Sequence, residues 1–356
     1  MQVTMISSDG PELVKVLQRE KCPHFIVPMT RRISPYQDLM ALWLLYRFIK
    51  KENPEIVHSH TPKAGLLSML AAKLAGVKLR IHTVAGLRYV SEAGIKRRIL
   101  ILMERITLRF ATHVWVNGPS LKRKLIAENL VPESKIDMVG YGSSNGIDIK
   151  RFSVSKLLLE VESQVKTSFD YNNQLNYIIC VGRIVGDKGI NELVDVFDGL
   201  YTDNKSLRLI LVGDFEDEVD PVSIKTRNRI NAGEGIMVAG WTDLVPYYMK
   251  LATFLVHPSH REGFPNVLLQ AGAIGCPIVC SDIDGNIDIV TNESTGLIFN
   301  VRDASSLKST LLKALADSQA MRKYAERMRA HVIDNFEQTR YWQLLLEKYN
   351  SILMTA

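Results

Sequence analysis

Short apolar runs rich in β-branched residues alternate with longer stretches of helical periodicity along the whole chain. In the first half the apolar runs predict strands at 3–7, 24–27, 56–60, 79–84, 113–117 and 135–139. Helical patterns lie between them at 38–51, 64–75 and 95–110. The second half repeats the arrangement, with strands at 176–181, 207–212, 235–239, 253–257, 277–281 and 296–299, and helices at 190–201, 265–274 and 337–353.

This alternation predicts an α/β protein with parallel, doubly wound sheets in two Rossmann-like domains that face a central cleft. A stretch rich in Gly and Ser at 140–152 breaks both periodicities and marks the linker. We therefore expect an N-terminal domain at 1–150, a C-terminal domain at 151–335, and a helix at 336–356 that packs back on the first domain. Ligands are expected at the carboxyl ends of the strands.

Composition narrows the class of protein. Of 356 residues, 46% are apolar and 23% are charged, as in an ordinary globular protein. The longest apolar run, 39–46, is far shorter than the ~20 residues that span a membrane, and no signal-peptide pattern follows Met1. Four cysteines without a CxxC pair predict reduced thiols in a cytoplasmic protein, and eight scattered histidines make a zinc site improbable.

The charge is unevenly distributed. Residues 1–150 carry 23 Lys and Arg against 12 Asp and Glu, whereas residues 151–356 carry 21 against 26. A basic first half favours an anionic partner such as a phospholipid surface or a lipid-linked phosphate; no nucleic-acid-binding motif is present, so nucleic acid is not expected. The helix at 95–110 combines five basic residues with an apolar stripe. It is either an interfacial helix or, the favoured reading, a surface helix whose stripe faces the core.

Two segments carry candidate chemistry. In "CVGRIVGDKGINELVDVF" a strand ends at Gly182, and a loop with Arg183 and Lys188 leads into a helix, an arrangement that attracts phosphate. The spacing is neither GxGxxG nor a P-loop. In "HPSHREGFPNVLLQ" Glu262 lies in the loop after a strand, where a sugar hydroxyl could meet it, and Gln270 lies one helical turn beyond Asn266 on a related face.

These segments, with the linker "NGID" and Phe152, resemble the family-4 retaining glycosyltransferases of the GT-B fold. "VHSHTPKAGLLSMLAAKLAG" and "RIHTVAGL" look like the bacterial branch that builds capsule, O-antigen and lipid-linked glycans. The resemblance covers nearly all of the chain, with its motifs in the family's order.

The resemblance implies a role for particular residues. Arg183 and Lys188 would hold the donor diphosphate, and Glu262 would contact hydroxyls of the donor sugar. His82 would lie near the reacting sugar, with His60 and Lys63 on the acceptor side. The remaining donor-binding positions would be Gly182, Gly213, Trp241, Gly263, Phe264, Asn266, Val267 and, at the ribose, Gln270.

The resemblance also implies the reaction. A hexose or N-acetylhexosamine would pass from a nucleotide sugar, UDP-linked, to a lipid-linked or polysaccharide acceptor with retention of configuration. The departing phosphate would accept the acceptor's proton. No DxD-like metal pair stands in a suitable place, so we expect a metal-independent, cofactor-free enzyme. It would act in the cytoplasm, peripheral on the inner face of the membrane, in bacterial surface glycan synthesis.

Two positions depart from the family. Gln270 stands where the family has a second Glu, which should weaken donor binding by about tenfold, because a neutral hydrogen bond is worth roughly 1 kcal/mol less than a charged one. The chain also opens on "VTMISSDG", which resembles the family's second strand, so its first βα unit is expected to be missing. Two alternatives remain: a degenerate, non-catalytic nucleotide-sugar-binding subunit, or a UDP-N-acetylglucosamine 2-epimerase.

Overall fold

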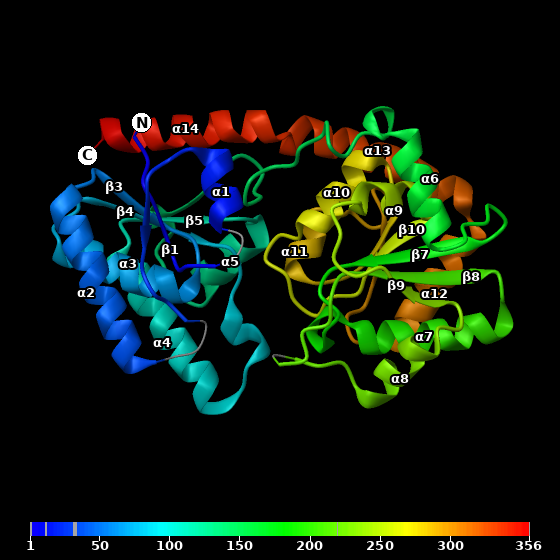
Figure 1. The fold of residues 1–356 in the computed structure, drawn as a ribbon. Coiled ribbons are helices and arrows are strands. Elements are labelled where there is room, and N and C mark those ends of the chain that lie inside the picture. Colours follow the sequence, from blue (N-terminus) through cyan, green and yellow to red (C-terminus); the bar gives the residue numbers. More distant parts are fainter. Residues whose placement is uncertain (1, 11–12, 31–33, 219, 356) are drawn as a thin grey trace. The chain divides into compact units, whose positions relative to one another are not determined.

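The computed structural model describes residues 2–10, 13–30, 34–218 and 220–355, and the chain forms two compact units (Figure 1). Unit 1 comprises residues 1–117, 122–138 and 348–356. Unit 2 comprises residues 118–121 and 139–347. The chain thus enters unit 2 briefly before the 140–152 linker, and returns to unit 1 at its end.

Unit 2 is built on one six-stranded parallel sheet. From edge to edge its strands are β12 (Leu297–Phe299), β11 (Ile278–Ser281), β10 (Phe254–His257), β7 (Asn176–Val181), β8 (Leu207–Val212) and β9 (Ile236–Val238). The central strands are buried on both faces, which explains why they read as continuous apolar runs instead of alternating ones. From β7 the chain builds outward through β8 and β9, then crosses back to begin the other half at β10.

Helices cover both faces of this sheet (Figure 1). Residues of α10, α9 and α13 share one buried cluster, and residues of α7 and α12 share a second. Both clusters include strand residues, because successive side chains point to opposite faces. The helices of unit 2 are α6 (Leu159–Ser168), α7 (Ile190–Asp203), α8 (Ile224–Ala232), α9 (Val245–Leu251), α10 (Asn266–Ile274), α11 (Asp284–Ile287), α12 (Ala304–Ala316) and α13 (Ser318–Phe336).

Unit 1 contains two parallel sheets. β1 (Met5–Ser7) pairs with β2 (His24–Ile26), and a separate sheet runs in the order β3 (Ile56–Ser59), β4 (Leu79–Val84), β5 (His113–Val116) and β6 (Ile136–Met138). Side chains from both sheets, Ile6 and Val57 among them, pack on one core that the helices α2 and α3 supply. The helices are α1 (Leu13–Glu20), α2 (Pro35–Glu52), α3 (Pro62–Leu74), α4 (Gly94–Phe110) and α5 (Pro119–Ala127).

The last helix, α14 (Gln338–Met354), contributes to both units. Near its start Tyr341 Oη donates to the carbonyl of Ser143 at 3.0 Å, and Trp342 Nε1 donates to Asn145 Oδ1 at 2.7 Å. Near its end Tyr349 is hydrogen-bonded to His58 of β3, and Lys348 is paired with Asp137. Among the residues that the structure describes, no helix is long and apolar enough to cross a bilayer.

The hydrophobic pattern predicted the α/β class and the parallel sheets correctly. A strand lies at each of the twelve predicted positions, most of them shorter by a residue or two at one end. These differences fall where strands fray and pairing stops, which periodicity does not specify. The pattern did not predict that β1 and β2 would form a sheet apart from β3–β6, because pairing partners are chosen in three dimensions.

One glycine lets the segment after β7 approach the segment after β10. Gly189 has a φ of 69° and caps the start of α7. A Cβ added there would lie 2.1 Å from the carbonyl oxygen of Pro258. Any L-side chain is therefore excluded by the backbone angle and by a backbone neighbour.

We expect Gly189→Ala to lower the free energy of unfolding by about 2–4 kcal/mol, because the clash and the left-handed angle add. The measurement is thermal or urea unfolding. The matched control is Gly199→Ala in the same helix, where an added Cβ meets nothing within 4 Å. That change should raise stability by up to about 1 kcal/mol. Equal stabilities for the two variants would contradict the close approach.

Candidate functional site

The candidate site of unit 2 lies where the direction of sheet building reverses. β7 and β10 are neighbours, but the chain leaves them towards opposite edges of the sheet. The segments that follow them, 182–189 and 258–265, therefore both begin at this switch point, at the carboxyl ends of the strands. Ligands of doubly wound sheets bind at such switch points, and both sequence motifs fall there.

Two glycines shape the backbone at the ends of β7 and β8. Gly182 and Gly213 have φ values of 147° and 144°. A Cβ on Gly213 would lie 2.1 Å from the carbonyl oxygen of Gly182, so the two backbones touch. The amide of Ile184 then donates to the carbonyl of Asp214 at 2.8 Å. The end of β7 is thus fixed to the next loop without any bulky side chain between them.

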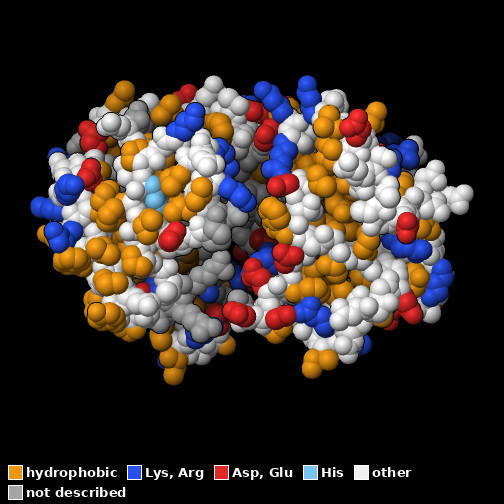
Figure 2. All heavy atoms as spheres, in the orientation of Figure 1, with side chains coloured by type: hydrophobic (Ala, Val, Ile, Leu, Met, Phe, Trp, Pro, Cys, Tyr) orange, Lys and Arg blue, Asp and Glu red, His pale blue; other side chains and the backbone are white. Residues whose placement is uncertain are grey.

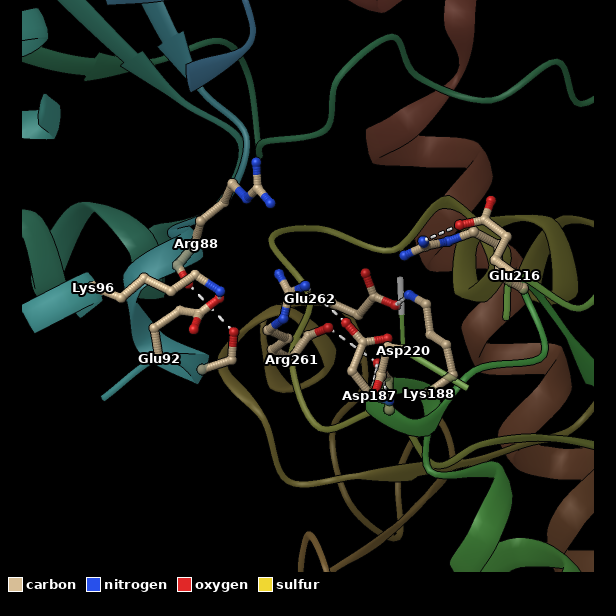
Figure 3. A network of polar contacts seen from close by, with 12 residues as sticks. Arg88, Glu92, Lys96, Asp187, Lys188, Glu216, Asp220, Arg261 and Glu262 are labelled. Carbon is tan, nitrogen blue, oxygen red and sulfur yellow. Dashed lines mark hydrogen bonds and ion pairs between the residues drawn. The ribbon is translucent and has the colours of Figure 1, made fainter. Parts of the chain in front are cut away.

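Hydrogen bonds join the segment after β7 to the segment after β10. The amide of His260 donates to the carbonyl of Asp187 at 2.9 Å. Arg261 Nη2 lies 2.7 Å from Asp187 Oδ2, and the amide of Asp187 donates to the carboxylate of Asp220 at 2.5 Å (Figure 3). Asp187 is therefore held through its amide, its carbonyl and its carboxylate. This network fixes the two chemically active segments relative to each other.

Lys188 and Glu262 meet at the centre of this arrangement. Lys188 Nζ is paired with Glu262 Oε1, and each side chain is only 18% exposed (Figure 3). His257 Nε2, at the end of β10, lies 3.3 Å from the same carboxylate oxygen. Burial by itself raises the pKa of Glu262, but His257 and Lys188 outweigh it and hold the pKa at about 2.

A carboxylate with so low a pKa cannot serve as a proton donor near neutral pH. Glu262 remains ionised and is suited to accept hydrogen bonds from hydroxyl groups of a ligand. Lys188 presents a positive charge in a largely desolvated position, where its attraction for a phosphate is stronger than in water. The pair therefore places a group suited to accept from hydroxyls in direct contact with a group suited to attract phosphate.

Arg183 does not join Lys188 in this structure. Its Nη1 lies 2.8 Å from Glu216 Oε2, in the segment after β8, and this pairing raises the pKa of Arg183 (Figure 3). Its side chain is 43% exposed. Two carboxylates, Glu216 and Glu262, thus neutralise the two cations that the sequence assigned to phosphate. A diphosphate that binds both cations has to displace these partners.

The other predicted donor residues occupy varied positions. Gly263 follows Glu262, and Asn266 opens α10, with Val267 and Gln270 half-buried on the same helix. Trp241 is 69% exposed after β9, and its amide donates to Asp214 Oδ1 at 3.0 Å. Phe264 differs, because its side chain is buried in the core with its ring centroid 5.6 Å from that of Phe336. Only the backbone of Phe264 is available to a ligand.

The predicted acceptor-side residues lie in unit 1. His82 of β4 is 2% exposed, and its Nδ1 is hydrogen-bonded to Ser59 Oγ at 2.8 Å. It packs beneath Gly65, where an added Cβ would lie 2.4 Å from the imidazole. The ring centroids of His60 and His58 are 4.0 Å apart. Lys63 is paired with Asp38 at 2.5 Å, a partner that the sequence did not suggest.

Sequence reasoning missed several residues that position the site. His257, Asp187, Asp220 and Arg261 make the contacts described above, yet none was singled out. Asp187 and Arg261 lie beside the predicted residues Lys188 and Glu262, so adjacency was a usable signal. Asp220 is remote in sequence from both segments, and nothing in the pattern pointed to it.

Burial makes His82 sensitive to acid. Desolvation, followed by the charge of His60, lowers the pKa of His82 to about 4, so it is neutral at pH 7. In the unfolded chain the pKa is near 6.5. The stability that neutral His82 contributes is complete above pH 6.5 and is lost as the pH falls towards 4.

We expect the free energy of unfolding to fall by roughly 3 kcal/mol over this range through His82 alone, since each pKa unit corresponds to ~1.4 kcal/mol. Urea unfolding at several pH values between 7.5 and 4.5 measures the effect. His82→Gln can still hydrogen-bond to Ser59, and it should show a shallower loss of stability on acidification. Parallel pH profiles for the two proteins would contradict the assignment.

Comparison with known proteins matches both halves of the chain to glycosyltransferase families. The family model "Glycosyl transferase 4-like domain" matches residues 1–142, and the model "Glycosyl transferases group 1" matches residues 162–331. The capsular polysaccharide biosynthesis glycosyltransferase CapM of Staphylococcus aureus is 34% identical over 99% of this chain and 90% of its own length. A UDP-Gal:alpha-D-GlcNAc-diphosphoundecaprenol alpha-1,3-galactosyltransferase of Escherichia coli is 25% identical over 94% of this chain and 85% of its own.

Solved structures agree on the fold. The HepE protein of Anabaena, crystallised with UDP-glucose, superposes with a TM-score of 0.81 at 17% identity. The match covers 98% of this chain and 91% of that one. At this identity the likeness concerns the fold, which is the two-domain GT-B arrangement expected from the motifs.

Proposed function

The chain belongs to the group 1 glycosyltransferases, and from this premise we propose that it transfers a hexose or N-acetylhexosamine from a UDP-sugar to a lipid-linked or polysaccharide acceptor. The reaction retains the anomeric configuration and needs no metal ion or other cofactor. The product is a bacterial surface glycan.

The contact between Lys188 and Glu262 carries this proposal. It places a buried cation and an ionised carboxylate at the switch point of the unit 2 sheet, between segments held together through Asp187. A nucleotide sugar has a diphosphate next to a ring of hydroxyl groups, and it matches both partners at once. Lys188 and Arg183 bind the diphosphate, Glu262 binds the sugar, and Gln270 binds the ribose.

The chemistry follows from charge. The bond between the anomeric carbon and the phosphate oxygen breaks, and negative charge grows on the departing diphosphate. Lys188 and Arg183 stabilise that charge, a role that a metal ion fills in other enzymes. The acceptor oxygen bonds to the anomeric carbon on the face that the phosphate leaves, and its proton passes to the departing phosphate oxygen. Glu262 stays ionised and takes no part in proton transfer.

Three relatives support the choice of substrates. HepE was crystallised with UDP-glucose, and the Escherichia coli relative is named for UDP-galactose and a diphosphoundecaprenol acceptor. CapM is named for capsular polysaccharide synthesis. An acceptor anchored in a bilayer calls for an enzyme at the membrane surface, so we place this protein peripherally on the inner face of the cytoplasmic membrane. The excess of basic residues over 1–150 suits that position.

The test begins with a thermal-shift panel of UDP-, GDP- and ADP-sugars, in which a UDP-sugar should raise the melting temperature most. With that donor and GlcNAc-diphosphoundecaprenol in detergent, release of UDP should depend on the acceptor and persist in EDTA. NMR of the product should show the donor's anomeric configuration.

Lys188→Ala should lower the rate by roughly a hundredfold or more, as the loss of one preorganised charge does in other enzymes. Lys308→Ala, a change at an exposed lysine of the same unit, is the matched control and should leave the rate unchanged. UDP release without any acceptor dependence would favour the epimerase alternative, and no shift with any donor would favour the degenerate subunit.

A second experiment concerns Gln270. A carboxylate accepts from both ribose hydroxyl groups, whereas Gln offers one acceptor oxygen and an NH₂ donor. We expect Gln270→Glu to tighten donor binding by about tenfold, because a charged hydrogen bond is worth ~1 kcal/mol more than a neutral one. Calorimetric titration with the UDP-sugar measures this. A weaker affinity in the variant would show that Gln270 does not contact the ribose.

A further inference from the structure

The helix α4 of unit 1 has an apolar row on its solvent side. Ile95, Ile99 and Leu102 are 76%, 46% and 57% exposed, and Ile106 continues the row half-buried. Their spacings of four, three and four residues place them on one line along the helix. The buried residues, Glu104, Thr107 and Leu108, lie on the opposite side. The sequence reading in which the stripe faces the core is therefore wrong for this row.

A row of arginines runs beside the apolar one. Arg98, Arg105 and Arg109 are exposed and spaced by seven and four residues, so they follow the same line along the helix. The one acidic side chain of α4, Glu104, is 7% exposed, and burial raises its pKa to about 7. It therefore does little to offset the arginines at the surface. Lys96, on the other flank, is already paired with Glu92 at 2.7 Å.

A groove continues this surface at the carboxyl end of α4. It has a volume of about 420 Å³, and Leu102, Ile106, Leu130 and Pro132 line it together with Arg105 and Arg109. Apolar and cationic side chains thus line one concave site together. Over the end of the molecule where Figure 1 places α2 and α4, hydrophobic side chains and Lys or Arg side chains lie next to one another (Figure 2).

We propose that this α4 face, consisting of Ile95, Ile99, Leu102, Arg98, Arg105 and Arg109, docks on the surface of an anionic phospholipid bilayer. The apolar row enters the boundary between headgroups and acyl chains, and the arginines bind lipid phosphates alongside it. The inference rests on the proposed function only in that a membrane-bound acceptor requires such a surface; the contacts themselves are independent of the donor and of the sugar.

Charge complementarity decides between this occupant and a second copy of the chain. In a symmetric dimer the same face meets itself, which would bring arginine rows of like charge together. A bilayer that contains anionic lipid offers a continuous sheet of opposite charge, and it accommodates an exposed apolar row without a shaped partner. The side of α4 that packs on unit 1 stays in place, so docking needs no unfolding of the helix.

The test is co-sedimentation of the full chain, without donor or acceptor, with vesicles of pure phosphatidylcholine and with vesicles that contain 30% phosphatidylglycerol. The protein should bind the anionic vesicles, and binding should weaken in high salt. Replacing Arg98, Arg105 and Arg109 together with Gln should lower the partition coefficient by roughly a hundredfold, at about fivefold for each lost charge. Replacing Ile95, Ile99 and Leu102 with Ser should lower it at least about tenfold.

Matched controls are available in unit 2. One control variant replaces Lys308, Arg322 and Lys323 with Gln, and the other replaces Leu159, Ile224 and Leu312 with Ser. Each removes as many exposed charges or apolar side chains as the corresponding α4 variant. Neither control should alter vesicle binding. Circular dichroism and melting temperature check that each variant is folded.

Equal binding to neutral and anionic vesicles, or full binding by either α4 variant, overturns the proposal. The proposal is also overturned if sedimentation velocity shows that the α4 variants lose self-association while they still bind vesicles. Transfer to a water-soluble acceptor should be unchanged in both α4 variants. Failure of docking is therefore distinguishable from failure of the proposed transferase activity.

Discussion

The close approach of the segments after β7 and β10 is the constraint on which the candidate site depends. Both segments leave the sheet of unit 2 at its switch point, and the left-handed Gly189 lets the backbone of one touch Pro258 of the other. Asp187 then joins them through its amide, carbonyl and carboxylate. Without this approach Lys188 and Glu262, which are 74 positions apart in the sequence, would not meet.

The two cations of the candidate site are held in ion pairs in the free protein. Lys188 and Arg183 are neutralised by Glu262 and Glu216, so the desolvation cost of each cation is already offset in the free protein. In the proposed function, a donor that brings a diphosphate would exchange one set of anionic partners for another. The same exchange would free the carboxylate of Glu262 for the sugar hydroxyls, and this one contact would couple phosphate and sugar recognition.

The two units divide the surface chemistry between them. Unit 2 pairs the charges of its candidate site, Lys188 with Glu262 and Arg183 with Glu216. Unit 1 carries the basic excess, and α4 sets its arginines beside an apolar row that faces solvent. The proposed transfer, from a water-soluble donor to a bilayer-bound acceptor, needs both kinds of surface. The buried His82 adds a sensitivity to acid within unit 1.

Periodicity, glycine positions and short motifs determined the strand and helix order, the parallel sheets, the two segments that form the candidate site and the basic first half. These are local properties, readable over a few residues. Only the tertiary structure decided that Arg183 pairs with Glu216 and that Asp220 accepts a hydrogen bond from the amide of Asp187. It also decided that β1 and β2 form a sheet apart from β3–β6, and that the apolar row on α4 faces solvent. Such choices depend on which surfaces meet after the chain has folded, and a helix with two apolar sides carries no local sign of which one is buried.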